Sequence, residues 1–503
     1  MNQTVSIEEY QELLANFKAV NEQLAKLTYD YNQLLKLLYA SRQERFVPES
    51  RPEQLSLPFE GIAPEVVTPE PPTESISYTR KKNTNHKGRN PLPEHLPVEE
   101  ITIEPDMESL EGYKCIGHDI TETVDYHPAE LIKIRYIRPR YVRIEQAEEN
   151  EATVVIGALP YRPIPKGIAE AGLLAYLIVA KYVDHLPFYR QIEKFKREHD
   201  WNISKSTIND WFAACCTLLE PLFEAYKRHI VNSTYLQADE SPIKVLSDEK
   251  QGKSHQGYMW VFRNPKDGSV LFDYRPGRGK ASLLDILSEF TGLLQFDWYS
   301  SYESFVRKRP QVKLMSCLAH IRRKFIEARD NHPSLAECAL KLIQQLYALE
   351  RQYQEEGLSD EQIAERRNIE ARPMFMELLT WVVEQHKNNL SKEAIGAALR
   401  YAAHQLPQLE VYLSDGRVKI DNNLIENAIR PLALGRKNYL FCGSHEGAKR
   451  AAMMYSFLAS CKTSGVNPLA WLKYVLQNLE HYPQKRIHEL FPANWKPEEN
   501  SSH

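Results

Sequence analysis

The amino-acid sequence predicts a multidomain α+β protein with a helical N-terminus, a small β-rich segment, and an α/β core interrupted by an all-helical insertion. Apolar residues repeat at heptad spacing over residues 5–46, which predicts a long helix. Strand-like runs alternate with one helical run over residues 234–296, which predicts the α/β core. Residues 329–414 have almost wholly helical periodicity. At 503 residues, of which 43% are hydrophobic, the chain is long enough for three or four domains.

The heptad within residues 1–46 has nine matches at alternating spacings of three and four residues. They are Tyr10, Leu13, Phe17, Val20, Leu24, Leu27, Tyr31, Leu34 and Leu38. This pattern predicts a coiled coil, so we expect a homo-oligomer, most simply a dimer. The alternative is a helix that packs on its own chain.

Residues 47–100 contain ten prolines and little periodic apolar pattern, so we expect a flexible, extended linker. Within it, residues 80–89 hold five Lys and Arg residues. This basic run either contacts phosphates or forms a solvated loop.

Residues 101–160 are expected to form a short β-rich segment, with strands at 101–103, 131–137 and 141–144. Basic residues are interleaved with tyrosines there, a composition typical of surfaces that contact a nucleic-acid backbone. Arg138 and Arg140 are the candidate DNA contacts. The alternative is a solvated strand face.

Residues 161–230 are predicted to be helical, with helices at 168–186, 188–199 and 204–230. The second and third helices are separated by a short turn, which fits a helix-turn-helix whose later helix enters the major groove. Its polar N-terminal side chains are the candidate base contacts: Lys205, Ser206, Thr207 and Asn209. An ordinary helical hairpin is the alternative, because turn spacing alone is a weak signal.

The first part of the predicted core, residues 231–328, has the element order β-β-β-α-β. Strands are expected at 234–246, 257–263, 269–275 and 292–296, with a helix at 280–290. Asp239 lies inside the first strand and Asp297 ends the fourth. Glu240 lies beside Asp239 in the same apolar run. Burying an unpaired carboxylate there would be costly, so this pair of acids indicates a functional role.

Glu426 is a third acidic candidate, on a helix expected to begin near Asn422 with Asp421 as its N-cap. Three carboxylates on separate elements are suited to hold two divalent cations for in-line displacement at phosphate. Asp421 and Glu446 are the rivals of Glu426 for the third position.

The element order resembles the ribonuclease H-like fold of retroviral integrases and DDE transposases. Several long blocks, in the same order, also resemble the insertion sequence 66 family of bacterial transposases and together cover most of residues 87–480. These blocks are Lys181–Gln191, Ala238–Val245, Gln295–Tyr302, Cys317–Phe325 and Ile420–Phe441.

The resemblance implies that Asp239, Asp297 and Glu426 are catalytic and bind two Mg²⁺ or Mn²⁺ ions. It implies that strands one and four lie side by side, that residues 329–414 are a helical insertion, that residues 415–480 complete the core, and that 481–503 form a tail. The implied activity is DNA cleavage and strand transfer. The implied partners are double-stranded DNA, as terminal repeats and target, and small accessory proteins encoded by the same element.

This sequence departs from the family pattern at two places. The family usually carries a four-cysteine zinc module, whereas residues 110–143 hold only Cys115, so we expect no structural zinc. Trp298 follows the second aspartate where the family commonly has glycine, and its indole either packs in the core or stacks on an unpaired base.

Further basic residues are candidates for gripping phosphates, although each could equally form an ordinary ion pair. They are His320, Arg322, Arg323, Arg430, Arg436 and Lys437.

The net charge of −4 means that DNA binding requires local basic clusters. Seven scattered cysteines without a C-x-x-C motif, and nothing that resembles a signal peptide, predict a reducing cytoplasm. The resemblance implies that this is the bacterial cytoplasm and that the protein is nucleoid-associated when bound to DNA. We expect no membrane role. Two rival functions remain: a ribonuclease H-like nuclease without strand transfer, and an inactive, DNA-binding transposase remnant.

Overall fold

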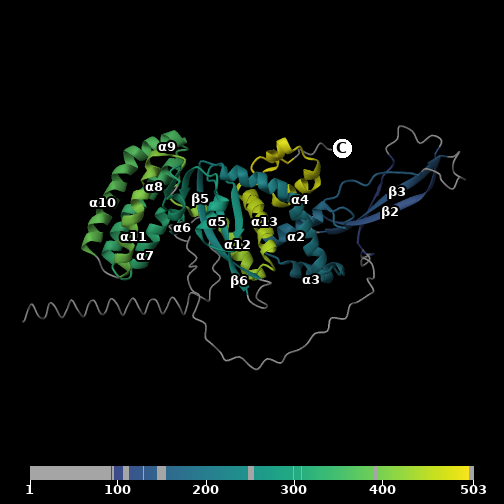
Figure 1. The fold of residues 1–503 in the computed structure, drawn as a ribbon, viewed down its shortest axis with the longest axis horizontal. Coiled ribbons are helices and arrows are strands. Elements are labelled where there is room, and N and C mark those ends of the chain that lie inside the picture. Colours follow the sequence, from purple (N-terminus) through teal and green to yellow (C-terminus); the bar gives the residue numbers. More distant parts are fainter. Residues whose placement is uncertain are drawn as a thin grey trace, which may run out of the picture.

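The architecture is that of a computed structural model, which describes residues 92, 94, 96–105, 113–127, 130–143, 154–246, 254–297, 300–307, 309–389 and 393–497. The predicted coiled coil and nearly all of the predicted linker lie outside these residues. The described chain is elongated, with a helical lobe at one end, a β-hairpin at the other, and a five-stranded sheet between them (Figure 1). It is a mixed α/β protein, as the sequence predicts.

The β-rich segment is a small sheet built around one long hairpin. Strands β2 (Tyr113–His127) and β3 (Glu130–Arg143) pair antiparallel. The short strands β1 (Val98–Thr102) and β4 (Val155–Ile156) add to β3. The prediction was incomplete here, because β2 was not expected and β3 runs unbroken through Pro139. Pro139 lacks an N–H to donate, yet its neighbours in β3 keep pairing with β2.

Three helices connect the hairpin to the central sheet. They are α2 (Ala171–Tyr182), α3 (Phe188–His199) and α4 (Lys205–Val231). Nearly all of α2 is buried, whereas α3 buries only a narrow apolar stripe. Asp200 ends α3 in a left-handed conformation, and the Ser204 hydroxyl caps α4 by accepting a hydrogen bond from the Thr207 N–H.

The central sheet has the strand order β7-β6-β5-β8-β9. Its strands are β5 (Tyr235–Leu246), β6 (Ser254–Arg263), β7 (Val270–Arg275), β8 (Gly292–Gln295) and β9 (Val312–Met315). The first three pair antiparallel, while β8 and β9 add in parallel on the other side of β5. The expected pairing of the first and fourth strands is thereby confirmed. Helices α5 (Lys280–Ile286) and α6 (Ser300–Val306) lie between the later strands in the chain order.

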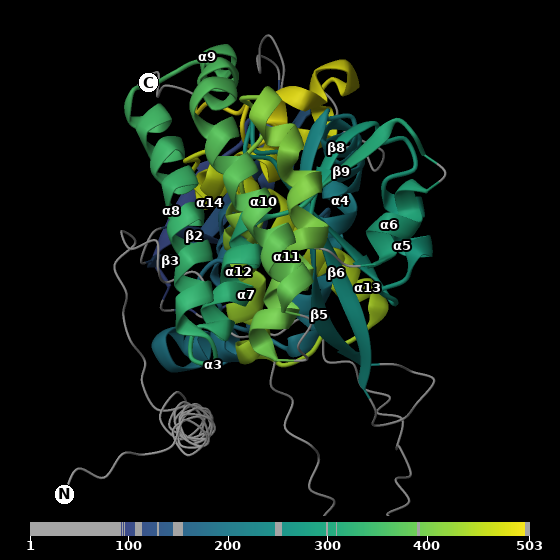
Figure 2. The ribbon, with the colours of Figure 1, turned by 90° about the vertical axis from the view of Figure 1, so that its left-hand side faces the viewer.

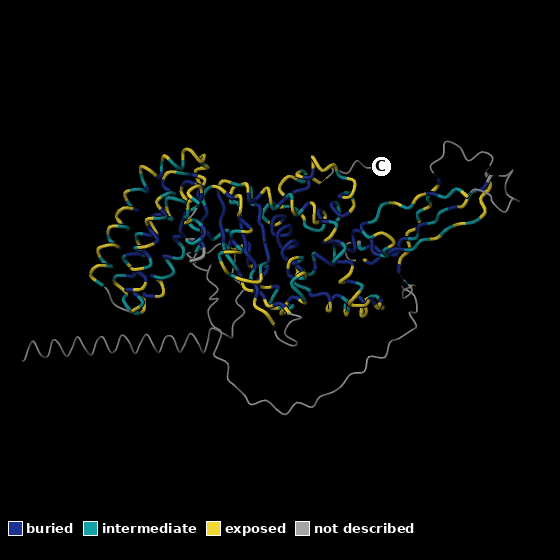
Figure 3. The backbone as a smooth tube through the Cα atoms, in the orientation of Figure 1, coloured by how far each residue is buried: buried dark blue, intermediate teal, exposed yellow. Residues whose placement is uncertain are grey.

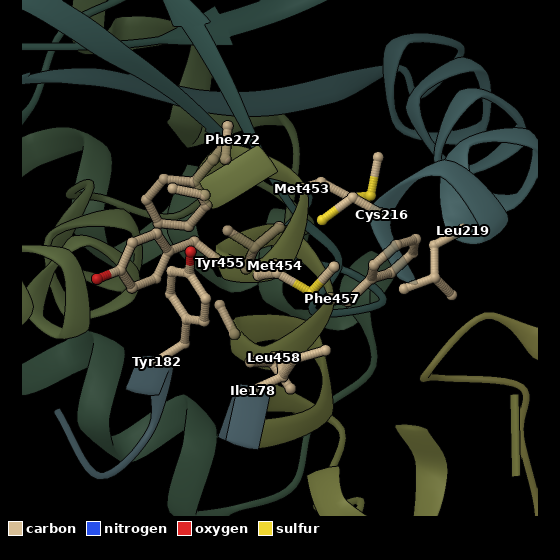
Figure 4. Close-up of a cluster of buried hydrophobic side chains, with 14 of the residues drawn as sticks. Ile178, Tyr182, Cys216, Leu219, Phe272, Met453, Met454, Tyr455, Phe457 and Leu458 are labelled. Carbon is tan, nitrogen blue, oxygen red and sulfur yellow. The ribbon is translucent and has the colours of Figure 1, made fainter. Parts of the chain in front are cut away.

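Helix α13 (His445–Thr463) is largely buried and packs on β7. Figure 4 shows its Met453, Tyr455 and Phe457 among side chains from α2, α4 and β7. The Ser456 and Ser460 hydroxyls accept hydrogen bonds from the N–H groups of Phe272 and Val270, at 2.7 and 2.9 Å. The serines of the buried helix therefore accept hydrogen bonds from backbone N–H groups of the edge strand β7, and these donors are not left unpaired.

The helical lobe has its own apolar core. It comprises α7 (Leu318–Ala328), α8 (Pro333–Glu355), α9 (Asp360–Arg366), η3 (Arg367–Ala371), α10 (Arg372–Asn388), α11 (Ala394–Leu409) and η4 (Glu410–Ser414). The long helices α7, α8, α10 and α11 lie alongside one another (Figure 2). The chain enters and leaves the lobe at adjacent points, because the Leu318 N–H donates to the Ile420 carbonyl at 3.2 Å.

The C-terminal part returns to the central sheet through α12 (Asn423–Tyr439), followed by α13, α14 (Pro468–Asn478), η5 (Leu479–His481) and η6 (Gln484–Leu490). Ile487, Leu490 and Phe491 are buried in the same core as α4. The segment expected to be a tail thus packs on the core as far as the described residues extend. Residues along the β-hairpin and on the outer side of the helical lobe are more exposed to solvent than those of this core (Figure 3). None of the described helices combines the length and the apolar character that a membrane span requires.

Candidate active site

Two aspartates meet at the centre of the sheet because of the register between β5 and β8. These strands run parallel with Gln237 opposite Gln295, and Asp239 and Asp297 each follow two residues later. Asp239, Glu240 and Asp297 each offer a carboxylate oxygen, and the three oxygens lie within 4.8 Å of one another. The sequence analysis named Asp239 and Asp297 as candidates but missed Glu240 as a member of this cluster.

The pKa values of both aspartates lie above the ordinary value of a carboxyl group. Burial raises the pKa of Asp239 well above its usual value, and the neighbouring carboxylates Asp297 and Glu240 raise it further. Burial also raises the pKa of Asp297. The Asp297 Oδ1 atom is buried and has no hydrogen-bond partner among the described residues. An unpaired buried carboxylate oxygen is unfavourable unless a ligand satisfies it.

Glu240 differs from the two aspartates because protein groups already hold its carboxylate. The Arg278 Nε atom donates to Glu240 Oε1 at 2.7 Å, and the Tyr302 hydroxyl donates to Oε2 at 3.3 Å. Burial, followed by the Asp297 charge, raises the pKa of Glu240 to about 7 despite Arg278. Glu240 therefore borders the cluster and links it to α6 and to the turn before α5.

Two buried glutamines dock the segment before α12 onto the strands that carry the aspartates. Gln237 Nε2 donates to Gln295 Oε1 at 2.9 Å and to the Asp421 carbonyl at 2.9 Å. Gln295 Nε2 donates to the Lys419 carbonyl at 3.0 Å. A segment more than 120 residues away in the chain is thus fixed beside β5 and β8. No pattern in the sequence distinguishes these glutamines from exposed ones.

Glu426, on the first turn of α12, faces the cluster but does not join it. Its Oε1 atom lies 3.5 Å from Arg323 Nη2 and 3.6 Å from His320 Nε2. Burial lowers the pKa of His320 to about 4, so this imidazole is neutral at physiological pH and Arg323 supplies the charge that faces Glu426. Burial raises the pKa of Glu426, and the negative charges of Asp421 and Asp297 add to this effect. Glu426 is therefore within electrostatic reach of the aspartates.

The two rivals for the third acidic position are engaged elsewhere. Asp421 accepts hydrogen bonds from the Tyr347 hydroxyl at 2.9 Å and from the Asn423 N–H at 3.1 Å. Glu446 lies exposed at the start of α13 and pairs with Lys449 at 2.6 Å. Neither belongs to the group of oxygens around Asp239.

Comparison with known proteins decides the family. A family model described as "Transposase IS66 family" matches residues 166–450, which is more than half of the chain. The chain belongs to the IS66 family of transposases. Models of the IS66 C-terminal element and of "Transposase C of IS166 homeodomain" match residues 456–493 and 26–101. The second of these falls mostly outside the described residues.

Relatives of this IS66 family transposase include three curated proteins of Sinorhizobium fredii (strain NBRC 101917 / NGR234). The protein y4qI is 30% identical over 97% of this chain and 92% of its own length. The protein y4jD is 26% identical over 95% and 97%, and y4hP is 28% identical over 84% and 79%. All three carry the description "uncharacterized".

The predicted DNA-contacting residues of this transposase fall into three separate regions. Near the cluster, His320 and Arg323 face Glu426, Arg322 is half-buried on α7, and Arg430 and Lys437 are exposed on α12. Arg436 points back into the sheet, where its Nη1 atom donates to Ser241 Oγ at 3.0 Å and to the Pro242 carbonyl at 2.6 Å.

The other two regions lie away from the cluster. On the hairpin, Arg140 pairs with Asp119, and Arg138 Nη1 donates to the Gly157 carbonyl at 3.1 Å. At the start of α4, Lys205, Ser206 and Asn209 are exposed and Thr207 is half-buried. Trp298 and the predicted coiled coil lie outside the described residues.

Proposed function

We propose that this chain is a DDE-type transposase that binds the terminal repeats of a bacterial insertion sequence, cuts them and joins them to target DNA. The observation that carries the proposal is that paired parallel strands place Asp239 and Asp297 together, with a buried Asp297 oxygen that has no hydrogen-bond partner in the described part of the chain. The strand order, with its three antiparallel strands and two parallel additions, supports a ribonuclease H-like core. Family membership supports transposition as the biological role.

The donor set fits divalent cations of the hard, oxygen-preferring type. Carboxylate oxygens within 4.8 Å of one another are suited to Mg²⁺ or Mn²⁺, and Asp239, Asp297 and Glu426 are the proposed ligands of two ions. Such ions would supply an activated nucleophile and neutralise charge on the phosphate during in-line displacement. Glu240, held by Arg278, would border the two aspartates and keep a fixed position beside them.

In the proposed reaction the chain's own residues orient the DNA at the acidic cluster. A water attacks a phosphodiester at the element end, the bond to the 3′ oxygen breaks, and a 3′-hydroxyl is released. This hydroxyl then attacks a phosphodiester of the target, whose 3′ oxygen leaves. Since Arg323 faces Glu426, a DNA phosphate that attracts Arg323 would release Glu426 toward the aspartates.

The proposed DNA partners engage more than one surface. The residues near the cluster would hold the phosphates at the cut, while the hairpin and the start of α4 would bind flanking duplex. The region from 26 to 101, matched by a homeodomain-type model, is a further candidate for DNA binding. We propose that the heptad in residues 1–46 pairs two chains so that two ends are held together, and that small accessory proteins assist.

A cleavage and joining assay tests the proposal. Purified chain is incubated in Mg²⁺ with a labelled duplex carrying the end of its own element, with or without supercoiled target DNA. Wild-type protein is expected to cut the end and to yield joined products. Asp239→Asn and Asp297→Asn should bind the duplex as tightly as wild type but fail to cut it. Glu446→Gln, the matched control at an exposed acid, should cut normally.

The same assay separates the two rivals. Cleavage without joined products would favour a nuclease of the same fold. Binding without cleavage by the wild-type protein would favour an inactive remnant. Cleavage by Asp239→Asn at the wild-type rate would overturn the assignment of the site.

A further inference from the structure

The end of α12 presents two large apolar side chains to solvent. Leu440 is 64% exposed and Phe441 is 44% exposed. Leu440 has φ 65° and ψ −44°, and the Phe441 N–H donates to the Tyr439 carbonyl at 2.8 Å. These features define a γ-turn with a positive central φ, the rarer and more strained form. Leu440 and Phe441 form the α12 tip.

The α12 tip is held in place from both sides. The Leu440 N–H donates to the Arg436 carbonyl at 3.0 Å, which ends the helix. Cys442 then pairs with the end of β5, through bonds of 2.9 Å from its N–H to the Lys244 carbonyl and from the Leu246 N–H to its carbonyl. Strained backbone with exposed apolar side chains persists only where the surroundings fix it, and such positions gather at functional sites. The tip is a rigid projection.

Basic side chains surround the α12 tip. Lys437 on α12 and Lys244 on β5 are exposed. Arg190 lies beside the Tyr189 ring, 5.6 Å from its centroid, and donates to Asn438 Oδ1 at 3.2 Å. Within the described part of the chain none of these three cations has an ion-pair partner. The next acid along the chain, Glu446, is paired with Lys449. The surface is therefore complementary to a polyanion.

The tip continues a stripe that starts at the candidate active site. Asn427, Arg430, Leu434 and Lys437 are exposed at spacings of three and four residues, which places them along one side of α12, and the tip follows the end of that helix. From Glu426 to the end of α12 at Tyr439 the helical rise amounts to about 20 Å. Since B-DNA rises about 3.4 Å per base pair, this length corresponds to roughly six base pairs.

We propose that the α12 tip enters the DNA as an apolar wedge and stacks on a base that has left the double helix, about six base pairs from the phosphate at the acidic cluster. The proposal rests on the proposed function, because it takes DNA as the substrate. The apolar side chains of the tip would contact the face of a base. The neighbouring basic side chains, which have no ion-pair partner among the described residues, would contact the phosphates on either side of it. A protein partner would instead need a broader apolar surface or matching acids.

Binding of two duplexes tests the wedge. Both have roughly 25 base pairs, about two turns of B-DNA, and one carries a single unpaired 2-aminopurine near its centre. Fluorescence anisotropy gives the affinity of the full chain for each duplex without divalent cations, so that no strand is cut. Wild-type protein is expected to bind the bulged duplex about tenfold more tightly and to quench the 2-aminopurine, because aromatic stacking stabilises an unpaired base.

Two variants separate the wedge from general DNA binding. The double variant Leu440→Gly, Phe441→Ser should bind the intact duplex within about twofold of wild type and lose both the preference and the quenching. Glycine suits the positive φ at position 440, so the variant should fold, and an unchanged melting temperature verifies this. Phe441→Tyr should keep the preference. Ile369→Ser removes a side chain that is equally exposed, at 63%, but lies on the helical lobe, and should behave as wild type.

The outcomes distinguish this inference from the proposed function. Equal wild-type affinity for the two duplexes would overturn the wedge and leave the transposase proposal standing. Failure of the wild-type protein to bind either duplex would overturn both. Light scattering gives the molar mass of the double variant. If this mass is lower than that of wild type while the preference for the bulged duplex is retained, the tip is instead an interface between protein chains.

Discussion

Gln237 and Gln295 are register partners on β5 and β8, and their side chains form a buried hydrogen bond of 2.9 Å. Each glutamine precedes one of the two clustered aspartates by two residues. Each also donates to a carbonyl of the segment that leads into α12. One pair of amides therefore fixes the spacing of Asp239 and Asp297 and the approach of Glu426.

Replacing Gln295 with leucine should lower the free energy of unfolding by roughly 3 kcal/mol. The change removes the acceptor of the Tyr235 hydroxyl, one of the two carbonyl acceptors of the Gln237 amide and the donor to the Lys419 carbonyl, and buried polar groups that lose a hydrogen bond are costly. Urea unfolding measures the loss. Gln352→Leu, at an exposed glutamine on α8, is the control and should change stability by less than about 0.5 kcal/mol. Equal effects of the two variants would contradict the docking role.

Asp239→Asn should stabilise the metal-free protein and remove its response to Mg²⁺. The substitution takes one charge out of a buried group of three carboxylates, so the melting temperature without metal should rise. In wild type, Mg²⁺ at about 100 times its dissociation constant should add about 2.7 kcal/mol. Differential scanning fluorimetry with and without Mg²⁺ measures both effects. Glu446→Gln should keep the wild-type response, and a Mg²⁺ shift that survives Asp239→Asn would place the metal elsewhere.

The metal-free protein should lose stability between pH 5 and pH 8, in part through Glu240. The folded-state pKa of Glu240 is raised to about 7, so the folded protein binds its proton more tightly than the unfolded chain does. Stability from this group is therefore present at low pH and is lost as pH rises toward 7. In Glu240→Gln, which cannot titrate, the decline in unfolding free energy over this range should be shallower. An unchanged slope would show that Glu240 is not responsible.

Arg323→Gln should tighten metal binding by the DNA-free protein by about threefold, the size expected for a partly exposed ion pair. The substitution removes the charge that faces Glu426 at 3.5 Å and frees this carboxylate for the cluster. Isothermal titration with Mn²⁺ measures the affinity. Lys324→Gln, which removes the neighbouring cation that pairs with Glu327, is the control. Weaker Mn²⁺ binding in Arg323→Gln would mean that Arg323 supports the metal-binding conformation instead.

Arg367→Ala should destabilise the helical lobe by about 3–5 kcal/mol, the usual cost of leaving a buried charge unpaired. Arg367 is almost fully buried, pairs with Glu350, and donates to the carbonyls of Tyr412, Asp415 and Val418. Circular dichroism during thermal unfolding measures the loss. Arg372→Ala, at an exposed arginine five residues later, should change stability by less than about 1 kcal/mol.

Those elements whose apolar pattern repeats regularly were predicted well from the sequence. The predicted bounds of α3 match the observed ones, and β5 was placed within one residue because apolar residues recur on both sides of Asp239. Parallel pairing of the first and fourth strands, which the resemblance implied, brings Asp239 and Asp297 together. The bounds follow from local apolar patterns, whereas the pairing followed from the resemblance of the element order to a known fold.

Features that depend on long-range contacts were not predictable. β2 was missed because both of its faces are partly exposed along the hairpin, so its side chains show no clear alternation. Glu240 was not among the predicted site residues, because the contacts that hold it beside the aspartates come from Arg278 and Tyr302, which are 38 and 62 residues away in the chain. The placement of Glu426 depends on glutamine amides that bond across more than 120 residues, and the sequence carries no local sign of such bonds.

The hydrogen bond between Leu318 and Ile420 has an evolutionary consequence. Because the lobe departs from and rejoins the core at adjacent points, its outer helices α9 and α10 can be shortened, lengthened or exchanged while the entry and exit stay only one bond apart. Helix α7 is more constrained, because His320 and Arg323 face Glu426. Helix α8 is constrained too, because Tyr347 bonds to Asp421. Variation in this lobe is therefore expected to concentrate far from the acids of the neighbouring sheet.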